Sequence, residues 1–472
     1  MTQKLIKNGT IVTSDKTYKA NLLIEGEKIS QIGEGITADG AEIIDAQGLL
    51  VLPGGVDPHV HLDLPMFGTV SSDDHYTGGK AAAFGGTTTL IDFVSQDQGS
   101  LEENIIRWRA HAEQKASVDF GFHMNITRFN GQVAEELTTL ASLGVTSVKV
   151  FTAYNNRLRL PDGEIFKVMR IAGRHNLLTM VHAENGDIID VLVDEALMAQ
   201  KTTPIWHART RPGWGEVEAS LRAVAIGAQA EAPVYLVHMN VAGEVDQLAY
   251  GRHKGVSVMG ETCPQYLFFT YREYERPDGA KWVCSPPMRD LEDQVRLWQG
   301  LEDGTIQVLA TDHCPFYFDG SKPIIYEGKP IAIPGKELGK DDFTKIPNGL
   351  PGVGDRLPIF WNSAVNTGRI TPNQFVKITA ENPARVFGLY PQKGSLTVGA
   401  DADIALWDPE LELEYGVKVA QHRTDHNLYE STTLTGFPVQ VYQRGNLLVK
   451  NREWYGKPGM GKFLPRAAGE II

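Results

Sequence analysis

Two histidines separated by one residue, His59 and His61, have a spacing that suits metal binding. On a β-strand, residues two apart point to the same side, so both imidazoles would face one point. Two imidazoles on one side form half of a site for a divalent metal. Asp57 and a turn at Gly54 and Gly55 precede the pair. The alternative is a pair of solvated loop histidines, so a metal site can be inferred only if the sequence offers further ligands.

Three further polar side chains stand at the ends of apolar segments. His182 lies in TMVHAE, His238 lies in YLVHMN, and Asp312 follows VLAT. A lone histidine in an apolar strand is more often a hydrogen-bonded core residue, but two of them beside a His-x-His pair favour a metal site. A carboxylate there is costly unless it is paired or binds a metal. Asp312 is therefore either half of a structural salt bridge or a ligand that could also act as general base on a bridging water.

Lys149, in TSVKVF, is the odd member of this set because it is a cation. An ammonium group inside an apolar strand is expensive, and divalent metals nearby would repel it. It could pair with an acid, remain a neutral amine, or react with carbon dioxide to form a carbamate. A carbamate is an anion that could bridge two metals. The residues alone leave these three outcomes open.

The segments around these side chains are typical of a parallel barrel. From Pro53 on, short apolar runs alternate with helical stretches such as 100–116, 130–143 and 216–231. Continuous apolar runs of this length suit parallel strands that are buried on both faces. The runs are 56–62, 87–94, 120–127, 147–154, 178–184, 234–240, 256–263 and 306–313. They predict an α/β fold, a TIM-like (β/α)8 barrel with catalytic groups at the carboxyl ends of its strands.

The two ends of the chain differ in pattern from the predicted barrel. Apolar and polar positions alternate around Asn-Gly, Glu-Gly and Gln-Gly turns near the start, and strand patterns return after about residue 390. We therefore expect residues 1–52 and 391–455 to form one small β-sandwich domain, and residues 53–390 to form the barrel. A Gly- and Pro-rich tail, 456–472, is expected to lie along a surface or subunit contact.

The composition favours a cytoplasmic soluble protein. The 472 residues can bury a large core, and a formal net charge of −13 argues against nucleic acid or an anionic membrane as the main partner. The three cysteines, Cys263, Cys284 and Cys314, show no C-x-x-C spacing, which argues against a disulfide framework. No apolar run approaches 18 residues, and we expect neither a signal peptide nor a membrane span.

Six segments together resemble the hydantoinase and dihydropyrimidinase branch of the amidohydrolase superfamily. They are GVDPHVHLD, TSVKVFTAYNN, VHAENGD, GETCPQYL, CSPPMR and FTKIPNGLPGV. His-x-His alone is a weak motif, but the six in this order are specific, and the resemblance covers nearly the whole chain. The eighth strand reads ATDHCPF, as in many dihydropyrimidinases, whereas some hydantoinases differ after the aspartate. The choice between the two names therefore stays open.

The resemblance implies a centre with two divalent metals, zinc or alternatively manganese or cobalt. It assigns His59 and His61 to one metal, and His182 and His238 to the other. Lys149, carbamylated by carbon dioxide to N6-carboxylysine, would bridge both. A bridging hydroxide would attack a ring amide carbonyl, and the two cations would stabilise the oxyanion.

The resemblance also implies groups that handle protons and substrate. Asp312 would complete the first metal site and act as general base. The Tyr154 hydroxyl would stabilise the oxyanion, unless it is an ordinary tyrosine at the barrel rim. Ser285 and Asn348 would hold the ring amide, largely through backbone groups. The implied substrate is dihydrouracil or a 5-substituted hydantoin, the product is an N-carbamoyl amino acid, and the assembly is a homotetramer or homodimer.

Two loops are expected to shape the pocket around the substituent and so to govern stereochemical preference. They are 62–72 and 151–160, with Leu64, Phe67 and Tyr154 as candidates.

The remaining histidines are interpreted as supporting, structural or surface residues. His123, His313 and Cys314 lie near the same rim and would support the site. The others are His75, His111, His175, His207, His253, His422 and His426.

Other members of the superfamily offer rival interpretations. Dihydroorotases carry a His-x-His-x-Arg motif, and its arginine binds the substrate carboxylate. Here Asp63 stands at the position of that arginine. Allantoinases share the metal ligands but usually lack the Pro-Asn-Gly-Leu-Pro-Gly loop. A non-catalytic scaffold related to dihydropyrimidinase would have lost metal ligands, whereas all six positions are filled here.

Overall fold

A barrel of eight parallel strands forms the centre of the protein in a computed structural model, which describes residues 3–66 and 68–472. The strands are β8 (Gly55–Val60), β11 (Thr87–Val94), β12 (Asp119–Asn125), β13 (Ser147–Phe151), β14 (Leu178–His182), β15 (Val234–Leu236), β16 (Val258–Thr262) and β17 (Val308–Leu309). The ring closes where Val60 pairs with His313 and the His61 N–H donates to the His313 carbonyl at 2.7 Å. The eight predicted runs are confirmed as strands, and with them the fold class.

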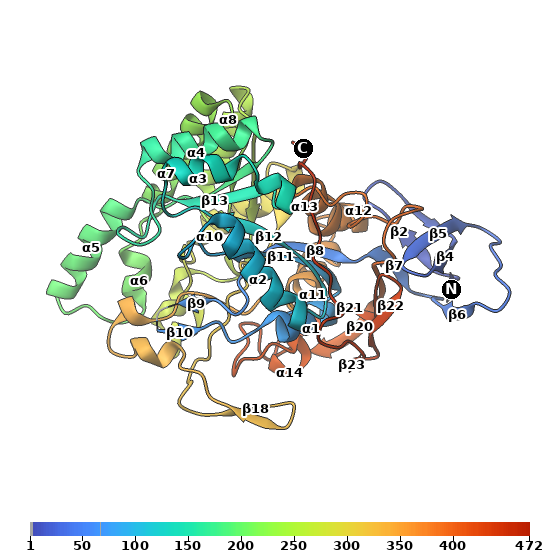
Figure 1. Cartoon of the computed structure of the whole chain (residues 1–472). Helices are drawn as coiled ribbons and strands as arrows, with labels where there is room; N and C mark the ends of the chain where they lie inside the picture. Colours follow the sequence, from blue (N-terminus) through green and yellow to red (C-terminus); the bar gives the residue numbers. More distant parts are fainter. Residues whose placement is uncertain (1–2, 67) are drawn as a thin grey trace.

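Helices follow the strands and surround the barrel (Figure 1). They are α1 (His75–Phe84), α2 (Leu101–Lys115), α3 (Gly131–Leu137), α4 (Asp162–Arg174), α5 (Gly186–Met198), α6 (Ile205–Arg209), α7 (Gly213–Ala230), α8 (Ala242–His253), α9 (Pro264–Phe268), α10 (Leu291–Asp303), α11 (Arg356–Phe360), α12 (Pro372–Val376), α13 (Asn382–Val386) and α14 (Val417–Ala420). The predicted stretches correspond to α2, to α7, and to α3 with a 3-10 turn at Leu140–Leu143. Among the described residues, no helix has both the length and the apolar character needed to cross a bilayer.

Both ends of the chain contribute to a small β domain beside the barrel, on the right in Figure 1. One sheet contains β23 (Glu453–Trp454), β22 (Asn446–Lys450), β21 (Thr433–Gln443), β20 (Ile404–Glu414), β7 (Leu50–Pro53), β2 (Thr10–Val12) and β3 (Thr17–Lys19). The other contains β5 (Lys28–Gly33), β4 (Asn21–Glu25), β1 (Gln3–Lys7) and β6 (Glu42–Asp45). Ile6, Leu22 and Ile404 share one buried cluster, so side chains of both sheets pack together. The limits assigned to each domain remain predictions.

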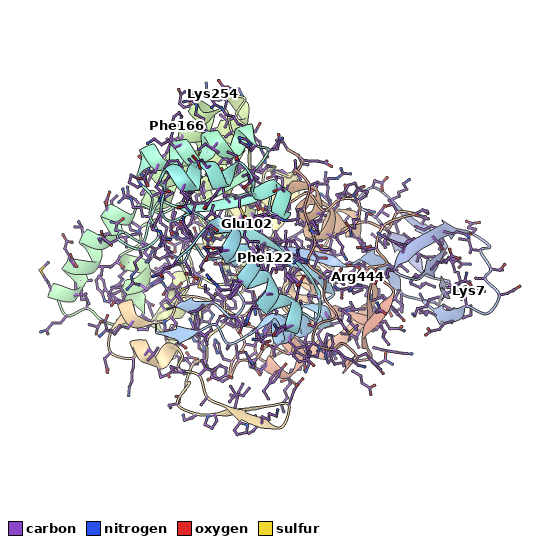
Figure 2. The ribbon with its side chains drawn as sticks, in the orientation of Figure 1. Lys7, Glu102, Phe122, Phe166, Lys254 and Arg444 are labelled. Atoms are coloured by element: carbon purple, nitrogen blue, oxygen red, sulfur yellow. The ribbon has the colours of Figure 1, made fainter. Side chains whose placement is uncertain are left out.

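The chain terminus runs against the barrel rather than away from it. Phe463 forms a bridge with Phe120 on β12, and its ring lies 5.4 Å from that of Phe122, near the centre of Figure 2. The Leu464 N–H donates to the Phe120 carbonyl at 2.7 Å, and Leu464 joins a buried cluster formed by barrel strands. Phe463 and Leu464 of the tail are therefore part of the folded core, whereas residues 467–472 are exposed.

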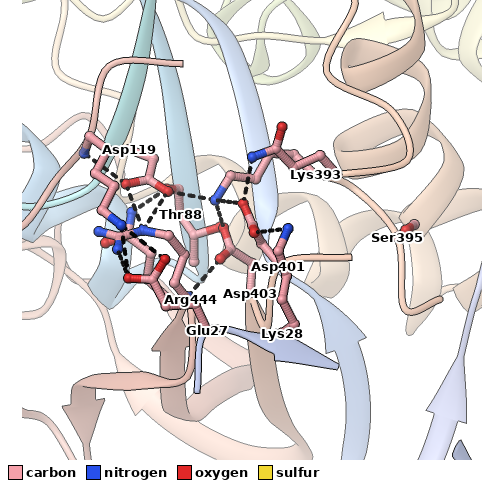
Figure 3. A network of polar contacts seen from close by, with 12 residues as sticks. Glu27, Lys28, Thr88, Asp119, Lys393, Ser395, Asp401, Asp403 and Arg444 are labelled. Atoms are coloured by element: carbon pink, nitrogen blue, oxygen red, sulfur yellow. Dashed lines mark hydrogen bonds and ion pairs between the residues drawn. The ribbon is translucent and has the colours of Figure 1, made fainter. Parts of the chain in front are cut away.

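A network of buried ion pairs joins the barrel to the β domain (Figure 3). The Lys393 ammonium lies 2.6 Å from Asp119, 3.1 Å from Asp401 and 2.9 Å from Asp403. The Arg444 guanidinium lies 3.0 Å from Asp119. Asp119 is the first residue of β12, so this network lies at the amino-terminal end of that strand.

Two hairpins lie in loops at the opposite end of the barrel. One consists of β9 (Pro65–Met66) and β10 (Thr69–Val70) and follows β8, and the other consists of β18 (Ile324–Tyr326) and β19 (Lys329–Ile331) and follows β17. The Thr69 hydroxyl donates to the Pro334 carbonyl, so the two loops are in contact.

Candidate metal centre

The six predicted metal ligands meet at the carboxyl ends of five barrel strands. In strand order they are His59 and His61 at the end of β8, Lys149 on β13, His182 at the end of β14, His238 after β15 and Asp312 after β17. Parallel strands end on the same side of a barrel, which brings together side chains that are far apart in the sequence.

Three of these residues converge on one point. Oδ1 of Asp312 lies 3.1 Å from Nε2 of His59 and 3.1 Å from Nε2 of His61. The ligand atoms of all three lie within 4.8 Å of one another, as around a shared cation. Nζ of Lys149 lies 3.0 Å from Nε2 of His59. Burial lowers the pKa of Lys149 to about 8, which enlarges the fraction of neutral amine near neutral pH.

The remaining two histidines form a second pair. Nδ1 of His182 lies 2.9 Å from Nε2 of His238. Burial lowers the pKa of both imidazoles, so both are neutral near neutral pH. Neutral imidazole is the form that binds a metal, and two facing ring nitrogens could share one.

Three residues of the site hold left-handed backbone conformations. The φ angles are 64° at Tyr154, 39° at His238 and 54° at Asp312. This conformation costs free energy in residues other than glycine, and it persists only where the surrounding structure imposes it. Such residues are frequent at functional sites. The strain therefore marks the same strand ends that the sequence singles out.

Two carboxylates that sequence analysis did not assign lie behind the histidines. Glu261, on β16, accepts from Nδ1 of His59, and Oε2 of Glu184 lies 2.7 Å from Nε2 of His182. Nη1 of Arg211 lies 2.9 Å from both oxygens of Glu184. Each carboxylate engages one ring nitrogen and leaves the other free for a metal. Two patterns in the sequence could have identified these carboxylates. Glu261 is an acidic residue inside the apolar run VMGETC, and Glu184 lies two positions after the strand-end histidine His182.

The site opens into a cavity of about 320 Å³. Its polar lining includes His61, Lys149, His182, His238, Asp312, Tyr154, Ser285 and Asn348, and its apolar lining includes Leu64, Phe151, Leu158 and Cys314. A larger hollow of about 660 Å³ beside Trp214 contains none of the predicted site residues, so size alone does not identify the site. Of the two candidates for shaping the pocket in the first loop, Leu64 lines the cavity, and Phe67 lies outside the described residues.

The three predicted substrate contacts lie together at one side of this cavity. Nδ2 of Asn348 donates to the Ser285 hydroxyl at 2.9 Å. Burial raises the pKa of Tyr154, so its hydroxyl keeps its proton and can donate a hydrogen bond. Gly349 follows Asn348 with φ 152°, and a Cβ there would lie 2.3 Å from the Cys314 carbonyl oxygen. Glycine therefore lets this loop approach the strand end closely.

The other histidines near the rim have hydrogen-bond partners that explain them. Nε2 of His123 donates to the Pro58 carbonyl at 2.8 Å. Nδ1 of His313 accepts from the Gly352 N–H at 3.0 Å, and its Nε2 lies 3.2 Å from Asp73. Of the remaining seven, the buried ones are His75, His207, His422 and His426, and those with exposed surface are His111, His175 and His253.

The donor set fits two divalent cations. Burial opposes ionisation of Asp312, but His59 and His61 outweigh it and hold the pKa of this carboxyl well below its usual range. An ionised carboxylate and neutral imidazoles are the ligands that zinc and similar metals take in catalytic sites.

Comparisons with known proteins point to one family over nearly the whole chain. The Amidohydrolase family model matches residues 50–435. D-hydantoinases from Geobacillus stearothermophilus and Streptomyces coelicolor are 45% and 40% identical, over 98% and 99% of this chain and 96% and 99% of their own. The crystal structure of dihydropyrimidinase from Brevibacillus agri NCHU1002 superposes with a TM-score of 0.95, at 44% identity and 99% coverage of both chains. The chain therefore belongs to the amidohydrolase family, within its hydantoinase and dihydropyrimidinase branch.

Proposed function

We propose that this protein hydrolyses the ring amide of D-5-substituted hydantoins, dihydropyrimidines or both, and releases N-carbamoyl amino acids. The observation that carries the proposal is the single cavity in which five of the six predicted ligands face Tyr154, Ser285 and Asn348. Membership of the family makes the protein a cyclic amide hydrolase. The D preference rests on similarity to proteins that are named D-hydantoinases.

The proposal includes two divalent metals per subunit, zinc or alternatively manganese or cobalt. His59, His61 and Asp312 would hold one, and His182 and His238 would hold the other. When bound, such cations lower the pKa of a water molecule and stabilise negative charge on the attacked carbonyl oxygen.

Lys149 would be carbamylated and would bind both metals. The lone pair of its neutral amine nitrogen would form an N–C bond with carbon dioxide, one C=O π pair would move onto oxygen, and the nitrogen would release a proton to solvent. The product is an anion, which removes the conflict between an ammonium group and nearby cations. Support comes from the position of Nζ, 3.0 Å from the His59 ring, and from the lowered pKa of the amine.

The protein's own groups would move protons and hold the substrate. The Asp312 carboxylate would take the proton of the attacking water and pass it to the leaving ring nitrogen. The protonated Tyr154 hydroxyl would donate to the carbonyl oxygen as negative charge develops. Ser285 and Asn348 would bind the amide edge of the ring and fix its orientation.

We also propose a cytoplasmic homotetramer or homodimer. The three cysteines are free and buried, which fits a reducing compartment. Exposed apolar side chains on α5, including Val191 and Met198, offer a surface that a second subunit could cover.

A substrate panel with metal analysis tests the proposal. Purified protein would be assayed for ring opening of dihydrouracil, hydantoin, D- and L-5-substituted hydantoins, allantoin and dihydroorotate. We expect turnover of D-5-substituted hydantoins or dihydrouracil, with about two metals per subunit. Rapid turnover of allantoin or dihydroorotate without hydantoin or dihydrouracil activity would favour the alternative allantoinase or dihydroorotase function. No turnover of any cyclic amide would favour a non-catalytic scaffold.

Replacement of the lysine tests the bridge separately. We expect Lys149→Ala to lose most bound metal, measured by plasma mass spectrometry, and to lose at least a thousandfold in kcat/KM. A Lys149→Ala protein that kept two metals and full activity would exclude the bridge.

A further inference from the structure

We propose that Lys336 is a positioning residue that joins the two loops carrying Ser285 and Asn348, and so fixes the geometry of the amide-binding side of the cavity. The inference rests on the proposed function, because these two residues are its substrate contacts. Lys336 itself is not among the residues that line the cavity.

The contacts of Lys336 reach both loops. The side chain is buried, with 1% of its surface exposed, and Nζ donates to the carbonyl oxygens of Val283 at 2.8 Å and Pro347 at 3.1 Å. Val283 precedes Ser285 by two residues, and Pro347 directly precedes Asn348. One ammonium group therefore bonds each loop next to the residue that the loop presents to the substrate.

The neighbouring backbone groups leave little freedom in the first loop. Nε2 of His207 donates to the Cys284 carbonyl at 2.7 Å, and the Tyr266 hydroxyl donates to the Pro286 carbonyl at 2.9 Å. Within the described ranges, no protein donor reaches the carbonyl of Ser285, which stays available for an N–H of a ligand. Lys336 completes this arrangement because its hydrogen bonds connect the loop that carries Ser285 with the loop that carries Asn348.

The electrostatics of Lys336 differ from those of a stabilising ion pair. In the described part of the chain, its ammonium is bonded by carbonyl groups and not by a carboxylate. Burial lowers its pKa to about 7, and the ionisable groups close enough to interact with it electrostatically include the thiols of Cys284 and Cys314 and the imidazoles of His207 and His426. Burying an amino group without a counter-ion, whether charged or neutral, costs free energy that an apolar side chain of similar length would avoid. Packing alone therefore does not explain a lysine here.

The backbone of Lys336 is itself fixed. Its N–H donates to the Tyr317 carbonyl at 2.7 Å, and a Cβ on Gly335 would lie 2.0 Å from the same oxygen. Pro334 accepts from the Thr69 hydroxyl in the loop that follows β8. The segment that carries β18 and β19 thus connects the amide-binding loops with the loop after β8, whose Leu64 lines the same cavity.

The test compares methionine variants of two buried lysines. Lys336→Met removes the ammonium and keeps the length of the side chain, and Lys393→Met makes the same change in the remote ion network of Figure 3. For the cyclic amide that the wild type opens best, we expect Lys336→Met to raise KM at least tenfold, with kcat changed less than threefold and metal content unchanged. Contacts that hold substrate and transition state equally affect KM in this way. Lys393→Met should lower the melting temperature and leave KM within twofold.

A conservative variant and a structural measurement guard the test against failed folding. Lys336→Gln keeps an N–H donor that can reach one carbonyl, so its KM should lie between those of wild type and Lys336→Met. A crystal structure of either variant should show a separation of Ser285 Oγ from Asn348 Nδ2 greater than the present 2.9 Å. An unchanged KM and an unchanged separation, or failure of both variants to fold, would overturn the positioning role. A wild type inactive on every cyclic amide would overturn the proposed function instead, and the separation would still test the role of Lys336.

Discussion

Two histidines of the site are each held through the ring nitrogen that faces away from the proposed metals. His59 uses Nδ1 to bind Glu261, and His182 uses Nε2 to bind Glu184. The tautomers are therefore opposite, and the free nitrogen of each ring points toward the other ligands. Arg211 holds Glu184 with two contacts of 2.9 Å, which keeps this carboxylate ionised and oriented.

At the scale of the residue, we expect Glu184→Gln to weaken the second metal site. Loss of the charge and of one of the two arginine contacts would let the His182 ring turn, and metal affinity should fall by about 10- to 100-fold. Titration with a metal-buffering chelator, followed by plasma mass spectrometry, would measure this. The exposed Glu195 on α5 offers a control in Glu195→Gln, which should bind metal like the wild type. Equal affinity in both variants would exclude the role of Glu184.

At the scale of the element, α8 begins beside the site and is capped by a buried acid. Glu244 accepts from the N–H groups of Asn240 at 2.9 Å and Val241 at 3.2 Å, and from the Ser220 hydroxyl on α7 at 3.0 Å. Burial raises its pKa to about 7. The folded protein therefore binds a proton here between pH 4.5 and 7 that the unfolded chain has released, and stability falls as the pH rises through this window.

The variant Glu244→Gln should remove this pH dependence, because an amide does not ionise. Its amide oxygen can accept from the two backbone N–H groups, and its amide nitrogen can donate to the Ser220 hydroxyl oxygen. Between pH 5 and pH 8, the free energy of unfolding of the wild type should fall relative to the variant by up to about 3 kcal/mol. Urea unfolding of both proteins at the two pH values measures the difference. The same difference at both values would contradict the prediction.

At the scale of the whole molecule, the barrel and the β domain are joined through buried charge. Lys393 contacts three carboxylates, two of them in the carboxyl-terminal part of the chain and one, Asp119, at the start of a barrel strand. These carboxylates raise the pKa of Lys393 despite its burial. Removal of one partner from a buried network leaves charges without compensation, which is more costly than absence of the whole network.

We expect Lys393→Met to lower the free energy of unfolding by about 3–5 kcal/mol. Activity per folded molecule should stay within twofold, because the network lies at the strand starts and the site at the strand ends. Lys462→Met is the control, since Lys462 is exposed where it pairs with Glu27, and its loss should cost less than about 1 kcal/mol. Denaturant unfolding followed by circular dichroism measures both. Equal costs for the two lysines would show that the buried network contributes no more than a surface pair.

The eight strands could be predicted from the sequence, and so could the positions at which the six proposed ligands stand out. Both depend on local patterns, because a polar residue that ends a long apolar run stands out, and parallel strands of a barrel all end on one side. Spacing alone placed His59 and His61 on one face of a strand. The roles of Lys149, Tyr154, Ser285 and Asn348 needed the resemblance to a family as well.

Tertiary structure alone decided which distant groups meet. The positions of Glu184 and Glu261 beside or within apolar runs are a weak signal in the sequence, and their bonds to particular histidines follow from how neighbouring strands pack. Nothing in the sequence around Lys336 distinguishes it from a surface lysine, but in the structure it is buried and bonded to two carbonyl groups. The tail shows no strand or helix pattern, yet Leu464 packs into the core. Spacing fixes the side of an element to which a residue points, whereas its partner across a long loop is set by packing, which no local pattern records.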